Sequence, residues 1–447
     1  MVHDLLSRRQ LLGGIGNAAL LSVLGRMNAF AQATPPDYKA LVCVFLAGGS
    51  DGHNLVVPLT QPEFTAYKAA RGSLALPDGN GALLPVETPG GTPYGLNPGL
   101  QPLHAHWAAG RLAMLANTGM LVQPVTRAQF LAKAVPVPTN LFSHSDQVQQ
   151  MQSGFPSTTG GTGWGGRAAD VMQPMNGKSS FPATVSISGP ALFCSGSVVQ
   201  AASLYPGFNL DAAGMSLWPT EAGDKRKAGL QQVLQFDSGL ALVQAANHVR
   251  QDATALNGLL TGSSATISTP FPGTTLGDQL LQVAKIIKLR STTGMSRQVF
   301  FCSLAGFDTH GGQSWQHWDL LHQLSEALDA FYKSTEEMGI ADRVTSFTMS
   351  DFGRTLQPSG TGSDHGWGSH HLMLGGAVHG GEMYGAFPSM ALGGPDDSGT
   401  RGAMIPTTST DQYGATLAAW LGVPADQLAS VFPNIGSFAS PNLGFMG

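Results

Sequence analysis

Apolar runs of strand length alternate along this chain with longer segments that have the period of an amphipathic helix. Four of the runs read as buried strands: "ALVCVFLAGG", "RLAMLANTG", "RQVFFCSLAGF" and "RVTSFTMS". Helical patterns cover residues 100–110, 145–154, 275–289 and 314–339, and most of 220–260. Strand and helix in this alternating order predict an α/β fold of three layers (α/β/α), with a mostly parallel sheet covered on both faces.

Acidic and histidine residues follow three of the predicted strands. Asp51 comes after the first strand, Asp308 and His310 come after a later one, and Asp351 follows the next. In open α/β sheets, ligands bind beyond the carboxyl ends of the strands. We therefore expect these side chains to converge on one rim of the sheet, although they are widely separated in sequence.

The Gly-rich stretch "SDFGRTLQPSGTGSDHGWGSHH" (350–371) adds more candidate metal ligands to a chain with few charges. Carboxylate and imidazole groups together bind divalent cations such as Zn, Mn, Mg or Ca. Asp364 could instead orient His365 through its other ring nitrogen. Taken by itself, Asp51 is best interpreted as a turn residue, since Asp favours such turns. Because Asp308, His310 and Asp351 also follow strand ends, we instead favour a metal or substrate site that all four residues share. The candidates are Asp51, Asp308, His310, Asp351, Asp364, His365, His370 and His371.

Composition narrows the class of protein. The chain has 447 residues, of which 42% are hydrophobic and 11% charged, so it can bury a large core. The net charge of −5 argues against a nucleic-acid partner, because phosphate binding needs clustered Lys and Arg. Long loops are expected from the 58 glycines and 28 prolines. The three cysteines, Cys43, Cys194 and Cys302, have no metal-type spacing and are expected to be buried thiols.

The first 33 residues have the pattern of an export signal. Arg8 and Arg9 precede a moderately apolar run that is shorter than a membrane span, and small-residue cleavage patterns end at Ala31 and Ala33. This pattern predicts a twin-arginine signal peptide, export to the periplasm or beyond, and the twin-arginine translocase as a transient partner. The mature chain is then expected to be one domain over 34–447, with a possible cap inserted within 155–275.

Several motifs together resemble the bacterial family called domain of unknown function 1501, which is grouped with the alkaline phosphatase and sulfatase superfamily. The motifs span nearly the whole mature chain: "LAGGSDGHN", "GFDTHGGQ", "SDFGRT", "GSDHGWGSHHLMLGGAVHGG" and "TSTDQYGATLAAWLGV". The resemblance implies an alkaline phosphatase-like fold and a metal-dependent hydrolase of small or polymeric phosphate or sulfate esters. It also implies metal ligands at Asp51, Asp308, His310, Asp351 and His365.

The resemblance leaves the catalytic groups open. A Ser or Thr at a helix start is the usual nucleophile, which matches Ser145 or Ser143 in "LFSHSDQ", although Ser is also an ordinary helix cap. Arg354 could clamp a substrate oxygen or pair with Asp351. Two departures stand out: Asp308 and His310 are separated by one residue instead of three, and Phe352 occupies a position where histidine is usual. These departures keep an alternative open, a non-catalytic protein that binds an envelope glycan or a partner protein.

Overall fold

The computed structural model describes residues 37–447 with several gaps. The segments outside the description are 78–81, 158–160, 178, 180, 200, 207–217, 237–238, 241–242, 245–246 and 248–264. The predicted signal peptide, at residues 1–33, and much of the helical pattern predicted up to residue 260 therefore lie outside the described residues. All three cysteines are buried and free.

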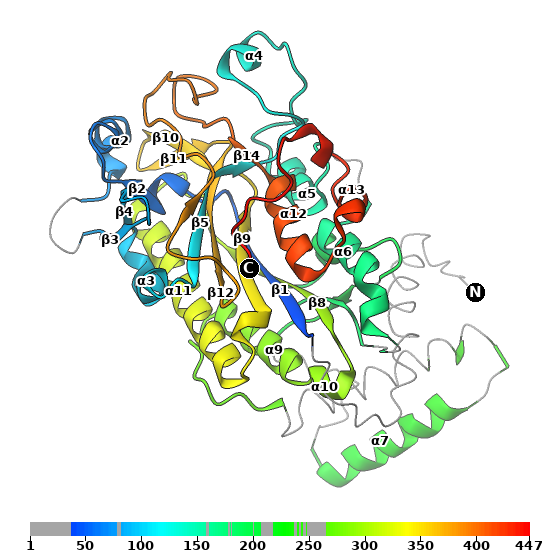
Figure 1. Cartoon of the computed structure of the whole chain (residues 1–447). Helices are drawn as coiled ribbons and strands as arrows, with labels where there is room; N and C mark the ends of the chain where they lie inside the picture. Colours follow the sequence, from blue (N-terminus) through cyan, green and yellow to red (C-terminus); the bar gives the residue numbers. More distant parts are fainter. Residues whose placement is uncertain are drawn as a thin grey trace, which may run out of the picture.

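A nine-stranded sheet forms the centre of the molecule (Figure 1), with the strand order β13-β5-β12-β9-β1-β8-β6-β7 and β14 paired with β5. All its strand pairs are parallel except those that β12 makes with β5 and β9. The mostly parallel α/β sheet predicted from the sequence is thus confirmed. Its strands are β1 (Lys39–Ala47), β5 (Leu112–Gly119), β6 (Thr184–Ser186), β7 (Ala202–Ser203), β8 (Arg297–Ala305), β9 (Val344–Ser350), β12 (Ser369–Gly375), β13 (Met383–Tyr384) and β14 (Thr408–Ser409).

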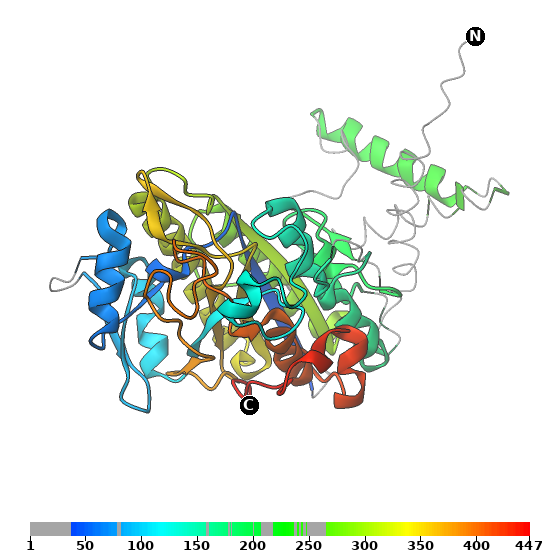
Figure 2. The same cartoon turned by 90° about the horizontal axis from the view of Figure 1, so that it is seen from above.

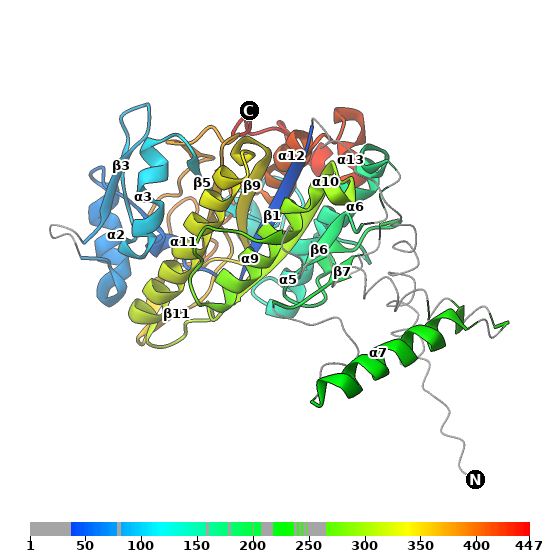
Figure 3. The same ribbon diagram turned by 90° about the horizontal axis from the view of Figure 1, so that it is seen from below.

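Both faces of this sheet are buried, because alternate residues of each strand pack into different cores. On β1, Val42 and Val44 join one hydrophobic cluster, whereas Cys43 and Phe45 join the other. The first cluster includes residues of α3 (Gln101–Ala108), α9 (Thr275–Lys288) and α11 (Gln313–Glu337), and α9 and α11 lie across this face in Figure 3. The second includes residues of α5 (His144–Ser153), α6 (Trp164–Met172), α12 (Thr410–Leu421) and α13 (Leu428–Val431). The predicted three layers are therefore present.

Smaller elements surround the sheet. Viewed from above, α2 (blue) and α13 (red) lie on opposite sides of the central sheet (Figure 2). The possible cap segment, 155–275, supplies β6 and β7 to the central sheet and also contains α7, which lies away from both cores in Figures 1 and 2. None of the helices in the described part of the chain is long and apolar enough to cross a membrane. The remaining elements are β2 (Val56–Pro58), α2 (Glu63–Arg71), β3 (Leu84–Glu87), β4 (Pro93–Leu96), α4 (Arg127–Leu131), α7 (Thr220–Gln235), α10 (Arg290–Thr293), β10 (Arg354–Ser359) and β11 (Gly362–His365).

The Gly-rich stretch after β9 forms a hairpin and not only a loop. Strands β10 and β11 pair in the antiparallel direction, and this pairing sets Arg354 opposite His365. Gly360, with φ of 63°, lies in the turn between them, where an L side chain would be strained. The hairpin thereby brings a guanidinium and an imidazole to the rim of the sheet at a fixed separation.

Helix α12 begins with a buried acid that makes folding depend on pH. Ser409 caps this helix, and its hydroxyl donates to Asp411 Oδ2 at 2.8 Å. Burial raises the pKa of Asp411 from 3.8 to about 7, against the opposing effect of the Ser409 hydrogen bond. Since the folded state holds this proton more tightly than the unfolded state, the stability that it contributes is complete below pH 4 and is lost as the pH rises to about 7.

We expect Asp411→Asn to remove this dependence. The free energy of unfolding of the variant, minus that of the natural protein, should rise by roughly 4 kcal/mol between pH 4 and pH 7 and then level off. Urea unfolding followed by circular dichroism across this range measures the difference, in which the contributions of other titrating groups cancel. A difference that is constant with pH would show that Asp411 is ionised in the folded protein at all these pH values.

Candidate metal centre

The carboxyl ends of β1, β8 and β9 lie level with one another and define the rim on which the candidate residues meet. Ala47 is the register partner of Ala305, and Leu46 is the partner of Ser350. Asp351 follows β9 directly, and its Oδ1 accepts a hydrogen bond from the Gly48 amide at 3.0 Å. The same parallel register that builds the sheet therefore brings side chains from distant parts of the sequence to a common edge.

Four ligand-type atoms converge at this rim. They are the Nε2 atoms of His144, His310 and His365 and the Oδ1 atom of Asp308. His365 Nε2 lies 3.1 Å from His144 Nε2 and 3.0 Å from His310 Nε2. Asp308 Oδ1 lies 3.0 Å from His310 Nε2, 3.3 Å from His365 Nε2 and 3.5 Å from His144 Nε2. His144, Asp308 and His365 each place one ligand atom within 4.8 Å of the others and so form a group that could hold a metal ion.

Each of the three histidines faces an acceptor with its other ring nitrogen. His144 Nδ1 lies 2.7 Å from Asp351 Oδ2, His365 Nδ1 lies 2.8 Å from the carbonyl oxygen of Phe142, and His310 Nδ1 lies 3.6 Å from Asp364 Oδ1. A carbonyl can only accept, so Nδ1 of His365 carries the proton, and Nε2 of the neutral ring presents its lone pair to the cluster. Metal-binding histidines in proteins are held by this kind of outer contact.

The ligand atoms of His144, Asp308 and His365 have the spacing of three ligands of a tetrahedral zinc-type site. Ligand atoms about 2.0–2.1 Å from a tetrahedral ion are about 3.3 Å from one another, which is close to the separations of 3.1, 3.3 and 3.5 Å among His144, His365 and Asp308. The imidazole lone pairs and the carboxylate oxygen repel one another at such separations. A divalent cation between them would attract each of these atoms, so the net interaction within the site would become attractive. Three imidazole nitrogens and one carboxylate oxygen also match the ligand types that zinc accepts.

Local electrostatics keep two of these groups in the forms that bind metal. Burial acts to raise the pKa of Asp308, but the hydrogen bond from Arg354 and the nearby His310 lower it overall, so the carboxylate is ionised at neutral pH. Burial lowers the pKa of His365, which favours the neutral ring. The side chains of Asp308 and His310 are 46% and 48% exposed, so a substrate can reach this side of the cluster.

Arg354 supports the cluster from below. Its side chain is fully buried, and Nη1 donates to Asp308 Oδ1 at 2.8 Å and to the Gly48 carbonyl at 3.3 Å, while Nη2 donates to the Ser363 carbonyl. The structure thus pairs Arg354 with Asp308, whereas the sequence suggested Asp351 or a substrate oxygen as its partner. In this position the guanidinium orients the carboxylate and offsets its charge.

Asp51 lies apart from the four converging atoms. Its carboxylate is fully buried, and Oδ2 accepts hydrogen bonds from Arg71 Nη2 and from Gln313 Nε2, the latter at 2.5 Å. Burial acts to raise the pKa of Asp51, but the positive charge of Arg71 and the adjacent His317 lower it overall. Burial lowers the pKa of His317 and of His53 to about 4, so both rings are neutral at pH 7. Asp51 therefore belongs to a polar cluster beneath the rim.

The two serine candidates flank His144 at the start of α5. Ser143 Oγ donates to Asp146 Oδ2 at 2.6 Å, and Ser145 Oγ donates to the same oxygen at 3.2 Å. Asn140 Nδ2 donates to the other carboxylate oxygen of Asp146 at 3.1 Å. Both hydroxyls thus donate to a carboxylate that could accept a proton from either of them. The two serines are the residues immediately before and after His144, which belongs to the cluster.

His144 is the member of the cluster that the sequence reasoning did not select. A histidine between two serines at a helix start gives little signal of metal binding, since such a position usually serves helix capping. Phe352, at the position where the resemblance implied a histidine, packs its ring 4.7 Å from the rings of both His144 and His365. His144 comes from a different element and places its imidazole beside this phenylalanine, next to that of His365.

The fold and the site together define an α/β protein with a candidate metal centre of three histidines and one aspartate at the carboxyl rim of its sheet. The sequence matches the model of the family described as protein of unknown function (DUF1501) over residues 38–407, and the chain belongs to this family. No curated protein has a sequence significantly similar to this chain.

Solved structures match this chain at low identity and low TM-score. The PsFucS1 sulfatase from a Pseudoalteromonas species is 10% identical, with a TM-score of 0.33 over 95% of this chain and 73% of its own. The phosphonate monoester hydrolase of Agrobacterium radiobacter is 9% identical, with a TM-score of 0.33 over 86% and 74%. The C-terminal periplasmic domain of EcEptC from Escherichia coli, in complex with zinc, is 8% identical, with a TM-score of 0.30 over 77% and 74%. The function proposed below rests on the side chains of this chain itself.

Proposed function

We propose that this protein is an exported metal-dependent hydrolase of phosphate or sulfate esters. The observation that carries the proposal is the convergence of three histidine Nε2 atoms and one Asp308 oxygen at an exposed rim. His365 Nε2 and Asp308 Oδ1 lie 3.3 Å apart, and each of them lies 3.0–3.5 Å from the Nε2 atoms of His144 and His310. The twin-arginine pattern at Arg8 and Arg9 supports export, because that route carries proteins that fold, often around a bound cofactor or metal, before they cross the membrane.

Each residue of the site has a separate task in this proposal. Asp308, His144, His310 and His365 would hold a divalent metal, which when bound would polarise the ester and stabilise developing negative charge. Asp351 and the Phe142 carbonyl fix the ring orientation of two of the histidines. The amino end of α5, where His144 lies, also favours an anion through the helix dipole.

The attacking group is either a serine hydroxyl or a water molecule. Ser143 and Ser145 both donate to Asp146, which could accept the proton that a hydroxyl loses when it attacks. The sequence places both serines at a helix start, as the superfamily resemblance requires. Comparing the Ser143→Ala and Ser145→Ala variants separates these alternatives, because attack by water would survive both substitutions.

The proposal is tested by assaying zinc- or manganese-loaded protein on aryl phosphate and aryl sulfate esters. We expect turnover of at least one ester class that disappears when a chelator removes the metal and returns when the metal is restored. Metal-loaded protein that hydrolyses neither class would refute the hydrolase and favour the alternative of a binding protein for a glycan or a partner.

The carboxylates that face the Nδ1 atoms of His144 and His310 predict which substitution lowers metal affinity more. Asp351→Asn removes the charge that lies 2.7 Å from His144 Nδ1, and we expect metal affinity to fall by roughly 10–100-fold. Asp364→Asn is the matched control, because its carboxylate lies 3.6 Å from His310 Nδ1 and also pairs with Arg401. Competition titration with a chromogenic zinc chelator measures both affinities. An equal or larger loss in Asp364→Asn would contradict the assigned order.

A further inference from the structure

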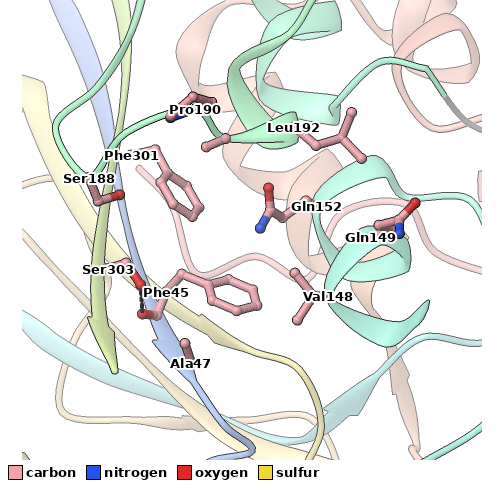
Figure 4. Close-up of a pocket in the computed structure, with 11 residues that line it drawn as sticks. Phe45, Ala47, Val148, Gln149, Gln152, Ser188, Pro190, Leu192, Phe301 and Ser303 are labelled. Carbon is pink, nitrogen blue, oxygen red and sulfur yellow. Dashed lines mark hydrogen bonds between the residues drawn. The ribbon is translucent and has the colours of Figure 1, made fainter. Parts of the chain in front are cut away.

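A pocket of about 380 Å³ opens beside the candidate metal centre, between the carboxyl ends of β1 and β8, helix α5 and the segment 188–192 (Figure 4). Its volume lies within the range of sites that bind one small organic molecule. The lining residues are Phe45, Ala47, Val148, Gln149, Gln152, Ser188, Pro190, Ala191, Leu192, Phe301 and Ser303.

The pocket adjoins the metal centre through two elements. Val148 lies four residues after His144 on α5, so the two side chains lie on the same face of this helix, one turn apart. Ala47 immediately precedes Gly48, whose amide holds Asp351 and whose carbonyl accepts from Arg354. The pocket and the cluster are therefore neighbours along α5 and at the end of β1.

The chemistry of the lining selects an uncharged occupant with an apolar face. None of the described residues that line the pocket is charged, so a charged group placed there would lose its hydration without gaining a partner. The rings of Phe45 and Phe301, with centroids 5.9 Å apart, form one wall, and Val148 and Leu192 supply further apolar surface. Flat apolar rings match walls of this kind.

Two glutamines add a small number of polar atoms. Gln152 Oε1 accepts from the Phe193 amide at 3.0 Å, which leaves its NH₂ group as a donor. Gln149 Nε2 donates to the Ser145 carbonyl at 3.0 Å, which leaves its Oε1 as an acceptor. Ser188 and Ser303 add two hydroxyls to the lining. These few polar groups suit a ring that carries one or two polar substituents.

We propose that this pocket binds the uncharged, aromatic-type ring of the ester substrate while the anionic ester group faces the metal centre. This inference rests on the proposed hydrolase function, and it names the organic part of the substrate. The pocket supplies the hydrophobic contact, and the cluster of histidines and Asp308 supplies the charge recognition.

The test measures binding of 2-naphthol, an uncharged ring with one hydroxyl, by calorimetry on the metal-loaded full chain. Val148→Trp fills the pocket from α5, and we expect it to weaken 2-naphthol binding at least tenfold. Ser188→Phe fills the pocket from the opposite segment and should also weaken 2-naphthol binding. If one of the two variants does not fold, the other still tests the inference. Leu131→Trp is the control, because Leu131 is exposed on α4 and outside the pocket.

A second probe tests the charge preference. We expect 6-hydroxynaphthalene-2-sulfonate, which carries an anionic group on the same ring, to bind the metal-loaded chain at least tenfold more tightly than 2-naphthol, because its sulfonate can face the metal centre while the ring occupies the pocket. Unchanged 2-naphthol binding in both pocket-filling variants, or equal binding of the charged ring, would overturn the inference. If 2-naphthol binds as expected but naphthyl phosphate and naphthyl sulfate are not hydrolysed, the proposed function fails and the pocket remains a site for an uncharged ring.

Discussion

Replacing His144 with alanine is expected to abolish tight metal binding while the fold is retained. His144 supplies one of the three imidazole nitrogens and lies at the half-exposed start of α5, so its loss removes a ligand without opening the core. Because losing an outer contact alone costs 10–100-fold in affinity, losing a ligand should cost at least about 100-fold. Ester hydrolysis should fall in parallel at fixed metal concentration.

Ser145→Ala is the matched control for this variant. Ser145 is the neighbouring residue on the same helical turn, and its hydroxyl bonds to Asp146 instead of to the cluster. Metal affinity in Ser145→Ala should equal that of the natural protein, whether or not its activity changes. Full metal affinity in His144→Ala would mean that this ring is not a ligand and would leave the site with two imidazoles.

Breaking the buried pair of Asp51 and Arg71 is expected to cause the largest loss of stability. Arg71→Met leaves the Asp51 carboxylate buried without its cation, and a change of this kind typically lowers the free energy of unfolding by about 3–5 kcal/mol. The double variant Asp51→Asn with Arg71→Met removes both charges and should recover at least half of this loss. Urea unfolding of the single and double variants measures the effect.

The same variants decide the role of Asp51. The structure places Asp51 with Arg71 and Gln313, so we expect every folded variant of this pair to keep the metal content of the natural protein. A double variant that is stable but has lost its metal would place Asp51 among the metal ligands, as the superfamily resemblance implies.

The architecture and part of the candidate site followed from sequence because they depend on local signals. Apolar runs that end in a turn located β1, β8 and β9, and the parallel register then brings their carboxyl ends together. Asp308 and His310 were found because they follow a strand directly, and His365 was found by its resemblance to a ligand motif. Each of these signals lies within a few residues of the position that it predicts.

The remainder of the site depends on contacts between distant segments, which leave little local signal. His144 reaches the cluster only because α5 packs against the second face of the sheet, more than 150 residues before Asp308 in sequence. Nothing near Asp51 in sequence shows that Arg71, from α2, will neutralise it in the interior. Arg354 forms an ion pair with Asp308 because the β10–β11 hairpin places the arginine side chain beneath that carboxylate.

The central claim is that this chain binds a metal at its three-histidine, one-aspartate cluster. The most direct test is metal content by plasma mass spectrometry, on protein exported through its own N-terminal segment and on the Asp308→Ala variant prepared in the same way. We expect at least one tightly bound divalent ion per natural chain and its loss from the folded variant. The same metal content in both proteins, or no metal in either, would contradict the claim.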